Sequence, residues 1–166
     1  MSNTPRRDVA IHMRLATAAD RPHLIPLINA AFSIEKFLEG TRTDDERLSD
    51  AMQKGEILIA ENAEGRLLGS IYMERRDPRR GYLGMLAVDP AQQGRGLGRR
   101  LMTAAENRFR TEGMESVEII VLNMRPELPP LYQKFGYVEV GREDFKPSRT
   151  LKPGVEIHGV VMAKQL

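Results

Sequence analysis

Cysteine is absent from the 166 residues of this chain. Without thiols the chain can form no disulfide, no thiolate zinc site and no covalent intermediate on a cysteine sulfur. It also lacks a run of about 18 consecutive apolar residues, the length that a membrane helix needs. The first 13 residues include Arg6, Arg7 and Asp8 and contain no apolar run that could serve as a signal peptide. We therefore expect a cytoplasmic protein with no membrane contact.

A strong excess of one charge sign is missing as well. The 25 Lys and Arg residues face 23 Asp and Glu residues, so the formal net charge is only +2. A nucleic-acid-binding surface would need more positive charge and interleaved aromatic rings, so no nucleic-acid partner is expected. The basic run Arg75–Arg80 is interpreted as a solvated hairpin tip, with a clamp for an acidic substrate as the alternative.

The length and the composition, 41% hydrophobic and 29% charged, are those of one soluble globular domain. We expect residues 1–12 to be a flexible N-terminal extension and residues 13–166 to form the domain. Capping residues at Thr17–Asp20 and the proline at Pro22 predict a first helix. A second helix is expected to follow Asp44 and to end near Gly55.

After these helices the apolar period changes to that of strands. The run Tyr82–Val88 is almost entirely apolar and predicts a central strand covered on both faces. The spacing of apolar residues from Gly96 to Gly113 predicts the best-defined helix. The order of elements indicates a mixed α/β or α+β sheet. The remaining predicted elements are strands at Ile57–Ala60, Leu67–Met73, Val117–Leu122, Tyr137–Val140 and Val155–Ala163 and a short helix at Leu131–Phe135.

A glycine-rich turn, Gln92–Arg100, joins the central strand to this helix. Glycines let the backbone turn tightly and direct successive N–H groups at an anion, and the helix dipole adds positive potential. Phosphate is the natural ligand of such a turn. Three arginines, Arg95, Arg99 and Arg100, raise the local positive potential or are solvated surface residues.

Two common phosphate motifs do not fit. A P-loop needs a lysine followed by Ser or Thr, and no lysine follows these glycines. A dinucleotide fold needs G-x-G-x-x-G, and here the third glycine, Gly98, comes one residue early. The spacing that remains is Gln-x-x-Gly-x-Gly, formed by Gln93, Gly96 and Gly98.

This spacing resembles the acetyl-CoA signature of the GNAT superfamily of N-acetyltransferases. The later block Leu131–Tyr137, LYQKFGY, is similar to the Leu-Tyr-x-x-x-Gly-Phe/Tyr element of that family. The resemblance covers Met13 to the C-terminus in element order and is specific between Tyr82 and Val140. It implies a mixed, mostly antiparallel sheet of six to seven strands, flanked by about four helices, with a splayed central strand pair.

The resemblance also implies roles for individual residues. The main-chain N–H of Leu86 would stabilise the oxyanion, and Tyr132 would protonate the departing thiolate. In the family the central strand binds the pantetheine arm, the glycine turn binds the pyrophosphate, and an asparagine after the next strand binds the cofactor arm. The implied cofactor-binding residues are Leu86, Ala87, Val88, Gln93, Gly94, Arg95, Gly96, Leu97, Gly98, Arg99 and Asn123.

The general base is not assigned. Some family members carry a glutamate on the central strand, but that place is occupied by Tyr82. Glu35, Glu74 and Asp89 are candidates better explained as solvated residues, and a water chain is the alternative. The three histidines have no metal-ligand spacing, so no metal is expected. The segment Phe32–Arg42 is expected to shape the acceptor pocket without identifying the acceptor.

The resulting hypothesis is an enzyme that transfers acetyl from acetyl-CoA to a primary amine of a small molecule or peptide. Because no cysteine is present, transfer is expected to be direct, within a ternary complex. The alternative is a CoA-binding sensor or regulatory module with weak catalysis. The terminal strand pair could also pair between subunits, which leaves monomer and homodimer open.

Overall fold

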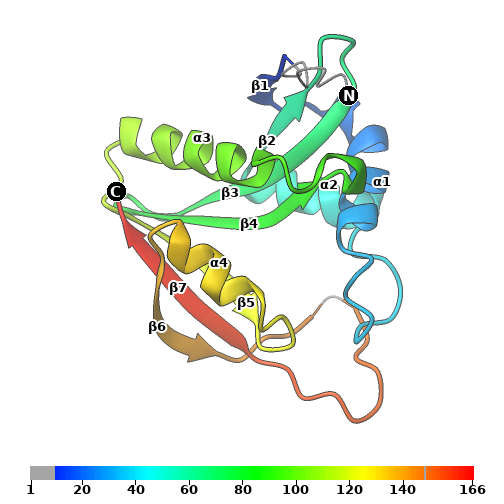
Figure 1. Ribbon diagram of the computed structural model, residues 1–166, viewed down its shortest axis with the longest axis vertical. Coiled ribbons are helices and arrows are strands. Elements are labelled where there is room, and N and C mark those ends of the chain that lie inside the picture. Colours follow the sequence, from blue (N-terminus) through cyan, green and yellow to red (C-terminus); the bar gives the residue numbers. More distant parts are fainter. Residues whose placement is uncertain (1–9, 148) are drawn as a thin grey trace, which may run out of the picture.

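The computed structural model describes residues 10–147 and 149–166. Within them seven strands form one sheet in the order β1-β2-β3-β4-β5-β7-β6 (Figure 1). All neighbouring strands are antiparallel except β4 and β5, which are parallel. The strands are β1 (His12–Leu15), β2 (Glu56–Glu61), β3 (Leu67–Asp77), β4 (Arg80–Val88), β5 (Ser116–Leu122), β6 (Val138–Glu143) and β7 (Gly159–Gln165).

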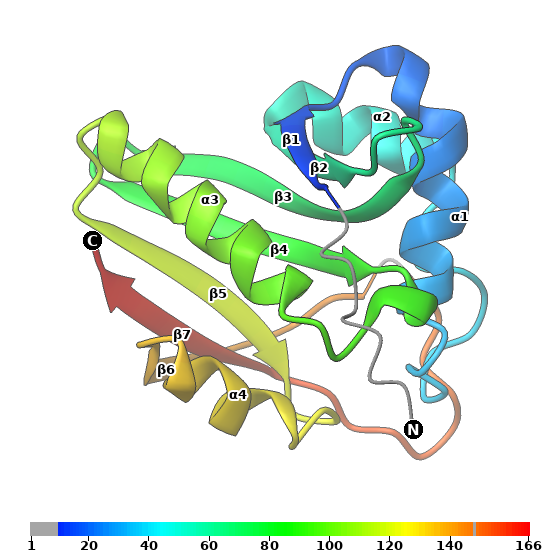
Figure 2. The same cartoon turned by 45° about the horizontal axis from the view of Figure 1, so that its top comes forward.

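Four α-helices cover this sheet, and they lie on both of its faces (Figure 2). The long helix α3 packs on β2, β3 and β4, whereas α1 contacts β3 and β4 from the other face and α2 contacts β2. The helix bounds are α1 (Arg21–Ala31), α2 (Asp45–Lys54), α3 (Leu97–Thr111) and α4 (Leu128–Lys134), with short 3₁₀ turns at Ala18–Asp20 and Pro90–Gln92.

The alternation of side chains along β2 shows why the chain folds into these layers. Leu58 and Ala60 belong to the core under α3, while Ile57 and Ile59 belong to the core under α1 and α2. Successive residues of a strand point to opposite faces, so one apolar run supplies both cores. This two-sided burial fixes the register of the central strands.

The centre of the sheet is split. Strands β4 and β5 pair only through Arg80–Tyr82 and Ser116–Glu118. Beyond these residues the two strands diverge, as Figure 2 shows. The mixed sheet with a splayed central pair, expected from the family resemblance, is therefore confirmed.

The first strand was not predicted. The sequence order places the helices first, but β1 precedes them and pairs with β2. Its four residues, HMRL, are too few and too polar to give a strand pattern. His12 belongs to β1, one residue inside the range expected to be an extension; residues 1–9 of that range lie outside the described residues.

Several predicted boundaries shift. The hairpin strands extend further than expected, so Arg75 lies within β3 and forms ion pairs with Glu56 and Glu112. Helix α4 begins at Leu128, three residues before the predicted start, because two prolines occupy its first turn. The closing strands begin later than predicted, at Val138 and Gly159.

Candidate active site

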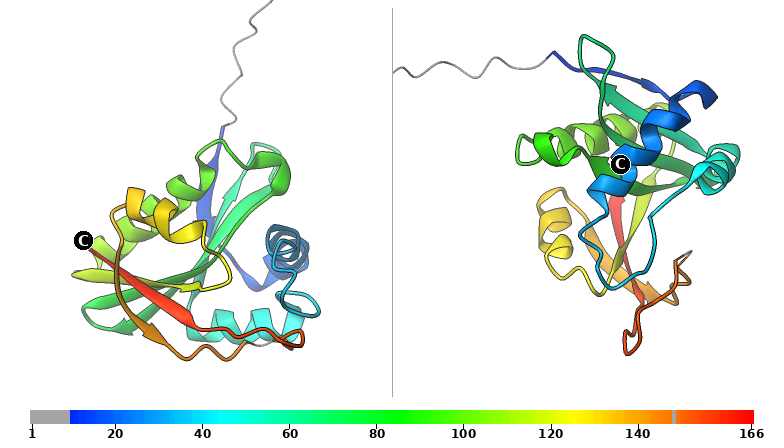
Figure 3. Two further views of the ribbon diagram at one scale, coloured as in Figure 1. Left: turned by 60° about the horizontal axis from the view of Figure 1, so that its bottom comes forward. Right: turned by 90° about the vertical axis from the view of Figure 1, so that its right-hand side faces the viewer.

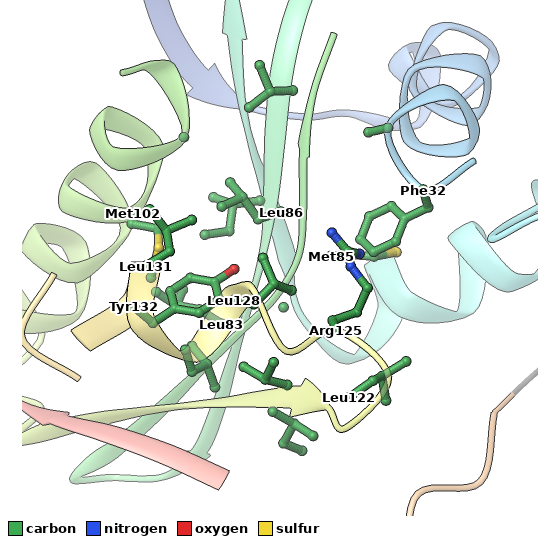
Figure 4. A pocket seen from close by; sticks show the side chains of 18 of the residues that line it. Phe32, Leu83, Met85, Leu86, Met102, Leu122, Arg125, Leu128, Leu131 and Tyr132 are labelled. Atoms are coloured by element: carbon green, nitrogen blue, oxygen red, sulfur yellow. The ribbon is translucent and has the colours of Figure 1, made fainter. Parts of the chain in front are cut away.

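The opening between β4 and β5 contains a cavity of about 750 Å³. Its walls come from β4, the glycine turn, α3, β5, α4 and the segments that connect α1 to α2 and β6 to β7. In Figure 4, Phe32 and Arg125 lie on one side of β4, and Met102 and Tyr132 lie on the other. The cavity therefore extends from the glycine turn and α4 to the α1–α2 connection.

The glycine turn owes its shape to two left-handed residues. Gly94 and Gly96 both have φ of +77°, a conformation that residues with a Cβ atom rarely adopt. A Cβ atom at either position would meet no protein atom within 4 Å, so the turn is open at the points where its backbone bends. The Gln93 side chain donates from Nε2 to the Val88 carbonyl over 3.3 Å and ties the turn to β4.

Gly98 differs from these two glycines. Its φ is not positive, and a Cβ atom there would make ordinary contacts with Leu86 and Val88 at 3.6 and 3.7 Å. The protein itself therefore does not require glycine at this position. Only a ligand lying close to the first turn of α3 would require it.

Strand β4 offers unpaired backbone to the cavity. Beyond Tyr82 its edge toward β5 has no strand partner. On its other edge the register with β3 slips between the pairs Ser70–Ala87 and Tyr72–Gly84, which places one extra residue in β4. Met85 at this bulge has φ of +49°, an uncommon conformation for a non-glycine residue. The bulge reorients the main chain immediately before Leu86.

Most of the predicted site residues line the cavity. They are Leu86, Val88, Gln93, Gly94, Gly96, Leu97, Gly98, Arg99 and Tyr132.

Three predicted residues lie elsewhere. Ala87 points to the opposite face, into the core under α1 and α2. Arg95 is exposed at the outside of the turn. Asn123 accepts from the His158 N–H over 2.8 Å and donates to the Glu156 carbonyl over 3.3 Å, so it fastens the start of β7 to the end of β5. Its side-chain amide is thus used within the fold.

Tyr132 projects its hydroxyl into the cavity (Figure 4). Its ring packs edge-on against Phe135 and Tyr137, with centroids 6.2 and 6.1 Å away. Burial raises the pKa of the Tyr132 hydroxyl, and the nearby Arg125 only partly opposes this effect. The side chain therefore stays protonated at neutral pH and can donate a proton.

The candidate bases occupy different environments. Burial raises the pKa of Tyr82, which makes this hydroxyl a poor base. Glu74 accepts from the Tyr72 hydroxyl over 2.7 Å, and Asp89 accepts from Arg66 over 2.7 Å; neither lines the cavity. Glu35 does line it and is buried, so the expectation that Glu35 is solvated was wrong.

Glu35 is buried because two arginines hold it. One carboxylate oxygen accepts from Arg149 and the other accepts from Arg125 over 3.2 Å. Sequence reasoning missed both arginines, since they lie 114 and 90 residues from Glu35 and belong to no motif. Because both of its oxygens accept from arginines, Glu35 holds these arginines in place and is poorly placed to act as a general base.

Glu35, Arg125 and Arg149 lie where the α1–α2 connection meets the β6–β7 connection. Leu38 and Leu151 form an isolated antiparallel bridge between the α1–α2 and β6–β7 connections. Backbone bonds flank this bridge, from Glu39 N–H to the Thr150 carbonyl over 2.8 Å and from Lys152 N–H to the Phe37 carbonyl over 3.1 Å. The two connections lie close to each other in Figure 3, and both contribute residues to the cavity lining. The expected involvement of Phe32–Arg42 in the pocket agrees with this geometry.

Over 10–147 and 149–166, no three His, Cys, Asp or Glu side chains are grouped so that they could hold a metal ion. No helix in the same part of the chain is long and apolar enough to cross a membrane.

Comparison with known proteins defines the family. Residues 28–148 match the model of the acetyltransferase (GNAT) domain, so the chain belongs to the GNAT family. A mycothiol acetyltransferase of Beutenbergia cavernae is 35% identical over 83 residues, which are 50% of this chain and 28% of that protein. Glucosamine 6-phosphate N-acetyltransferase 1 of rice (Oryza sativa subsp. japonica) is 38% identical over 90 residues, 50% of this chain and 53% of the relative. The chain thus spans about half or less of the length of these relatives.

The fold has close counterparts among solved structures. A GNAT family acetyltransferase from Elizabethkingia anophelis, solved with acetyl-CoA bound, superposes with a TM-score of 0.74. The match covers 94% of this chain and 98% of that one at 18% sequence identity. At this identity the similarity supports the fold.

Proposed function

We propose that this protein is an acetyl-CoA-dependent N-acetyltransferase that acts on a primary amine. The observation that carries the proposal is the shared cavity: the open turn at Gly94 and Gly96, the unpaired edge of β4 and the Tyr132 hydroxyl all face it. The names of two relatives and of one solved structure point to the same chemistry.

In this proposal the chain binds acetyl-CoA largely through its backbone. The N–H groups of the glycine turn and the N-terminus of α3 hold the pyrophosphate. The unpaired edge of β4 hydrogen-bonds the pantetheine amides as an added strand would. Arg99, whose guanidinium lies 5.4 Å from the centre of the Phe135 ring, adds positive charge beside the turn.

The chemical step is a direct transfer in a ternary complex. The amine nitrogen forms a bond to the acetyl carbon, and the carbon–sulfur bond breaks. The Leu86 N–H stabilises the oxyanion, and Tyr132 donates its proton to the departing sulfur. The nitrogen loses its proton to water, and water reprotonates Tyr132 after the thiol leaves, so the enzyme gains and loses no net proton. Since the chain has no cysteine, an acetyl-thiol intermediate on the enzyme cannot form.

Two measurements test this proposal. Isothermal titration with acetyl-CoA should show binding at sub-millimolar concentration, and no binding would refute the function. Thiol release is then followed across polyamines, amino acids, amino sugars and peptide N-termini. Binding without release on any amine would favour a CoA-binding regulatory module. Ping-pong kinetics would contradict direct transfer.

A further inference from the structure

The part of the cavity beside the α1–α2 and β6–β7 connections is strongly basic. The cavity wall there carries Arg42, Arg125, Lys146 and Arg149, and Glu35 is the single acidic residue among those that line the cavity. A neighbouring hollow of about 300 Å³ shares Phe32, Glu35, Leu38, Arg42 and Arg149 with the cavity and adds Lys36 and Lys152 to its lining. Six cationic side chains and one carboxylate thus line this part of the cavity and the neighbouring hollow.

The carboxylates in and near this cluster are already engaged. Glu35 accepts from Arg125 and Arg149 with its two oxygens. Arg125 also donates from Nε to Glu127 over 2.6 Å. These contacts hold Arg125 and Arg149 in place and partly offset their charge. They leave no acidic group for the remaining arginine.

That remaining arginine is Arg42. Within the described parts of the chain its guanidinium has no hydrogen bond or ion pair, and it lies over the Phe32 ring, 5.2 Å from the ring centre. Burial lowers the pKa of Arg42, Glu35 opposes this effect, and the positive charge of Arg149 adds to it. A cation that is partly removed from water and lacks a partner is costly. An anion that reached it would recover that cost.

We propose that the acetyl acceptor carries an oxyanion, a carboxylate or a phosphate, and that Arg42 binds this group while the amine faces Leu86 and Tyr132. The inference rests on the proposed acetyltransferase function and narrows its substrate class. A guanidinium presents paired N–H donors that match two oxygens of either group. Arg149 and Lys146, on the same wall, add long-range attraction.

The phosphates of CoA do not account for this charge. The open glycine turn is formed by Gly94 and Gly96 and is flanked by Arg95, Arg99 and Arg100. In Figure 4, Arg125 and Phe32 lie across β4 from Tyr132 and Met102. The basic wall is therefore placed to meet the second substrate.

Matched acceptor pairs test the inference. One pair is an amino acid and its carboxamide, and the other is an amino-sugar phosphate and the same amino sugar without phosphate. The wild-type protein should acetylate the charged member of at least one pair with a kcat/KM about tenfold higher or more. The pair that responds identifies the oxyanion.

Variants of Arg42 then test whether this side chain causes the preference for the charged acceptor. Arg42→Gln should reduce the charged-to-neutral ratio of kcat/KM about tenfold, mainly by raising the KM for the charged amine. Arg42→Lys should restore part of the ratio. The control is Arg79→Gln at the hairpin tip, where the side chain is 77% exposed; it removes one positive charge far from the cavity and should leave the ratio unchanged.

The outcomes separate the two proposals. Equal or better transfer to the neutral amines, or a ratio that Arg42→Gln does not alter, overturns the anionic acceptor and leaves the acetyltransferase function intact. A lack of transfer to every amine refutes the acetyltransferase function and the inference with it. Unchanged acetyl-CoA binding in Arg42→Gln confirms that the variant is folded. A lower charged-to-neutral ratio of kcat/KM then means that the charged acceptor binds more weakly.

Discussion

Glu35 and Arg149 lie 114 residues apart in the sequence, yet they form an ion pair in which each side chain is 5% exposed. Arg125 donates to the second oxygen of Glu35. The pair therefore connects the α1–α2 segment, the end of β5 and the β6–β7 segment around one carboxylate. It fixes the part of the cavity wall that these two connections form.

Glu35→Gln should destabilise the protein. The substitution keeps the size of the side chain but leaves two largely buried guanidinium groups without their shared counter-charge. Breaking a buried ion pair costs about 3 kcal/mol or more in free energy of unfolding. Urea denaturation measures this change. Glu64→Gln, at an exposed turn position, is the control and should change the free energy by less than about 0.5 kcal/mol.

Gly96→Ala should weaken acetyl-CoA binding by more than about tenfold. Alanine at φ of +77° is strained by about 1 kcal/mol, and its Cβ would stand at the open side of the turn. The matched control is Gly65→Ala, in a hairpin turn with φ of +81° and equally open surroundings. Both variants should lose similar stability in urea, but only Gly96→Ala should raise the dissociation constant in a calorimetric titration. Equal affinities would contradict a phosphate-binding turn.

The predictions from sequence succeed where local pattern decides the structure. The capping aspartate at Asp44, the glycine after α3 at Gly113 and the alternating apolar residues of β2 each act within a few residues. The glycine spacing identifies the turn for the same reason, because left-handed positions depend on local backbone sterics. The fold class followed from the order of these elements.

The parts that sequence reasoning missed depend on distant contacts. Strand β1 exists because β2 offers it a partner, and its four residues give no period of their own. Glu35 was expected to be solvated because its partners, Arg125 and Arg149, are close to it only in the folded chain. The side chain of Ala87 lies in the core under α1 and α2, a direction set by the bulge at Met85, and the main-chain contact predicted for this residue stays a prediction.

Tyr132→Phe should lower turnover about 100-fold while the affinity for acetyl-CoA stays within about threefold, because only the hydroxyl is lost. Since burial raises the pKa of Tyr132, this side chain stays protonated at neutral and mildly alkaline pH, and its deprotonation should not reduce turnover there. The steady-state rate at which the free CoA thiol is released measures turnover. Equal turnover in the variant would mean that another group protonates the thiolate.

Tyr137→Phe is the matched control for this variant. The Tyr137 hydroxyl is buried and has no hydrogen-bond partner among the described residues. Its removal should leave turnover unchanged and should raise the free energy of unfolding by up to about 1 kcal/mol. A large loss of turnover here would show that removing a buried hydroxyl next to Tyr132 is enough to slow the reaction, so the Tyr132→Phe result would not by itself identify Tyr132 as the acid.

Lys164→Met should destabilise the core beneath α3. The Lys164 ammonium donates to the two oxygens of Glu106 over 2.8 and 3.3 Å, and the Glu106 side chain is only 4% exposed. Without the lysine the buried carboxylate has no counter-charge, which lowers the free energy of unfolding by about 3 kcal/mol. The double variant with Glu106→Gln removes that charge and should recover part of the loss. A double variant that is as unstable as the sum of the single changes would argue against coupling.

Asp20→Asn should reduce stability in a pH-dependent way. Arg14 donates two hydrogen bonds to the Asp20 carboxylate, over 2.8 and 2.9 Å, and these bonds lower the pKa of Asp20 from 3.8 to about 2. Because the pKa is lower in the folded state, the stabilisation is fully present above the unfolded value near 3.8 and is lost as the pH falls through about 2. The free-energy difference between wild type and Asp20→Asn should therefore be largest above about pH 4 and shrink toward pH 2.

The measurement is urea denaturation at a series of pH values between about 2 and 7, with the exposed Asp50→Asn as control. Arg14 also lowers the pKa of Glu61, through a hydrogen bond of 3.2 Å. Arg14→Met removes the largest cause of the lowered pKa of both carboxylates, so it should reduce their pH-dependent stabilisation and give a larger loss at pH 7 than Asp20→Asn. A difference between wild type and Asp20→Asn that stays constant across this range would mean that Asp20 stabilises the fold through packing and not through its charge.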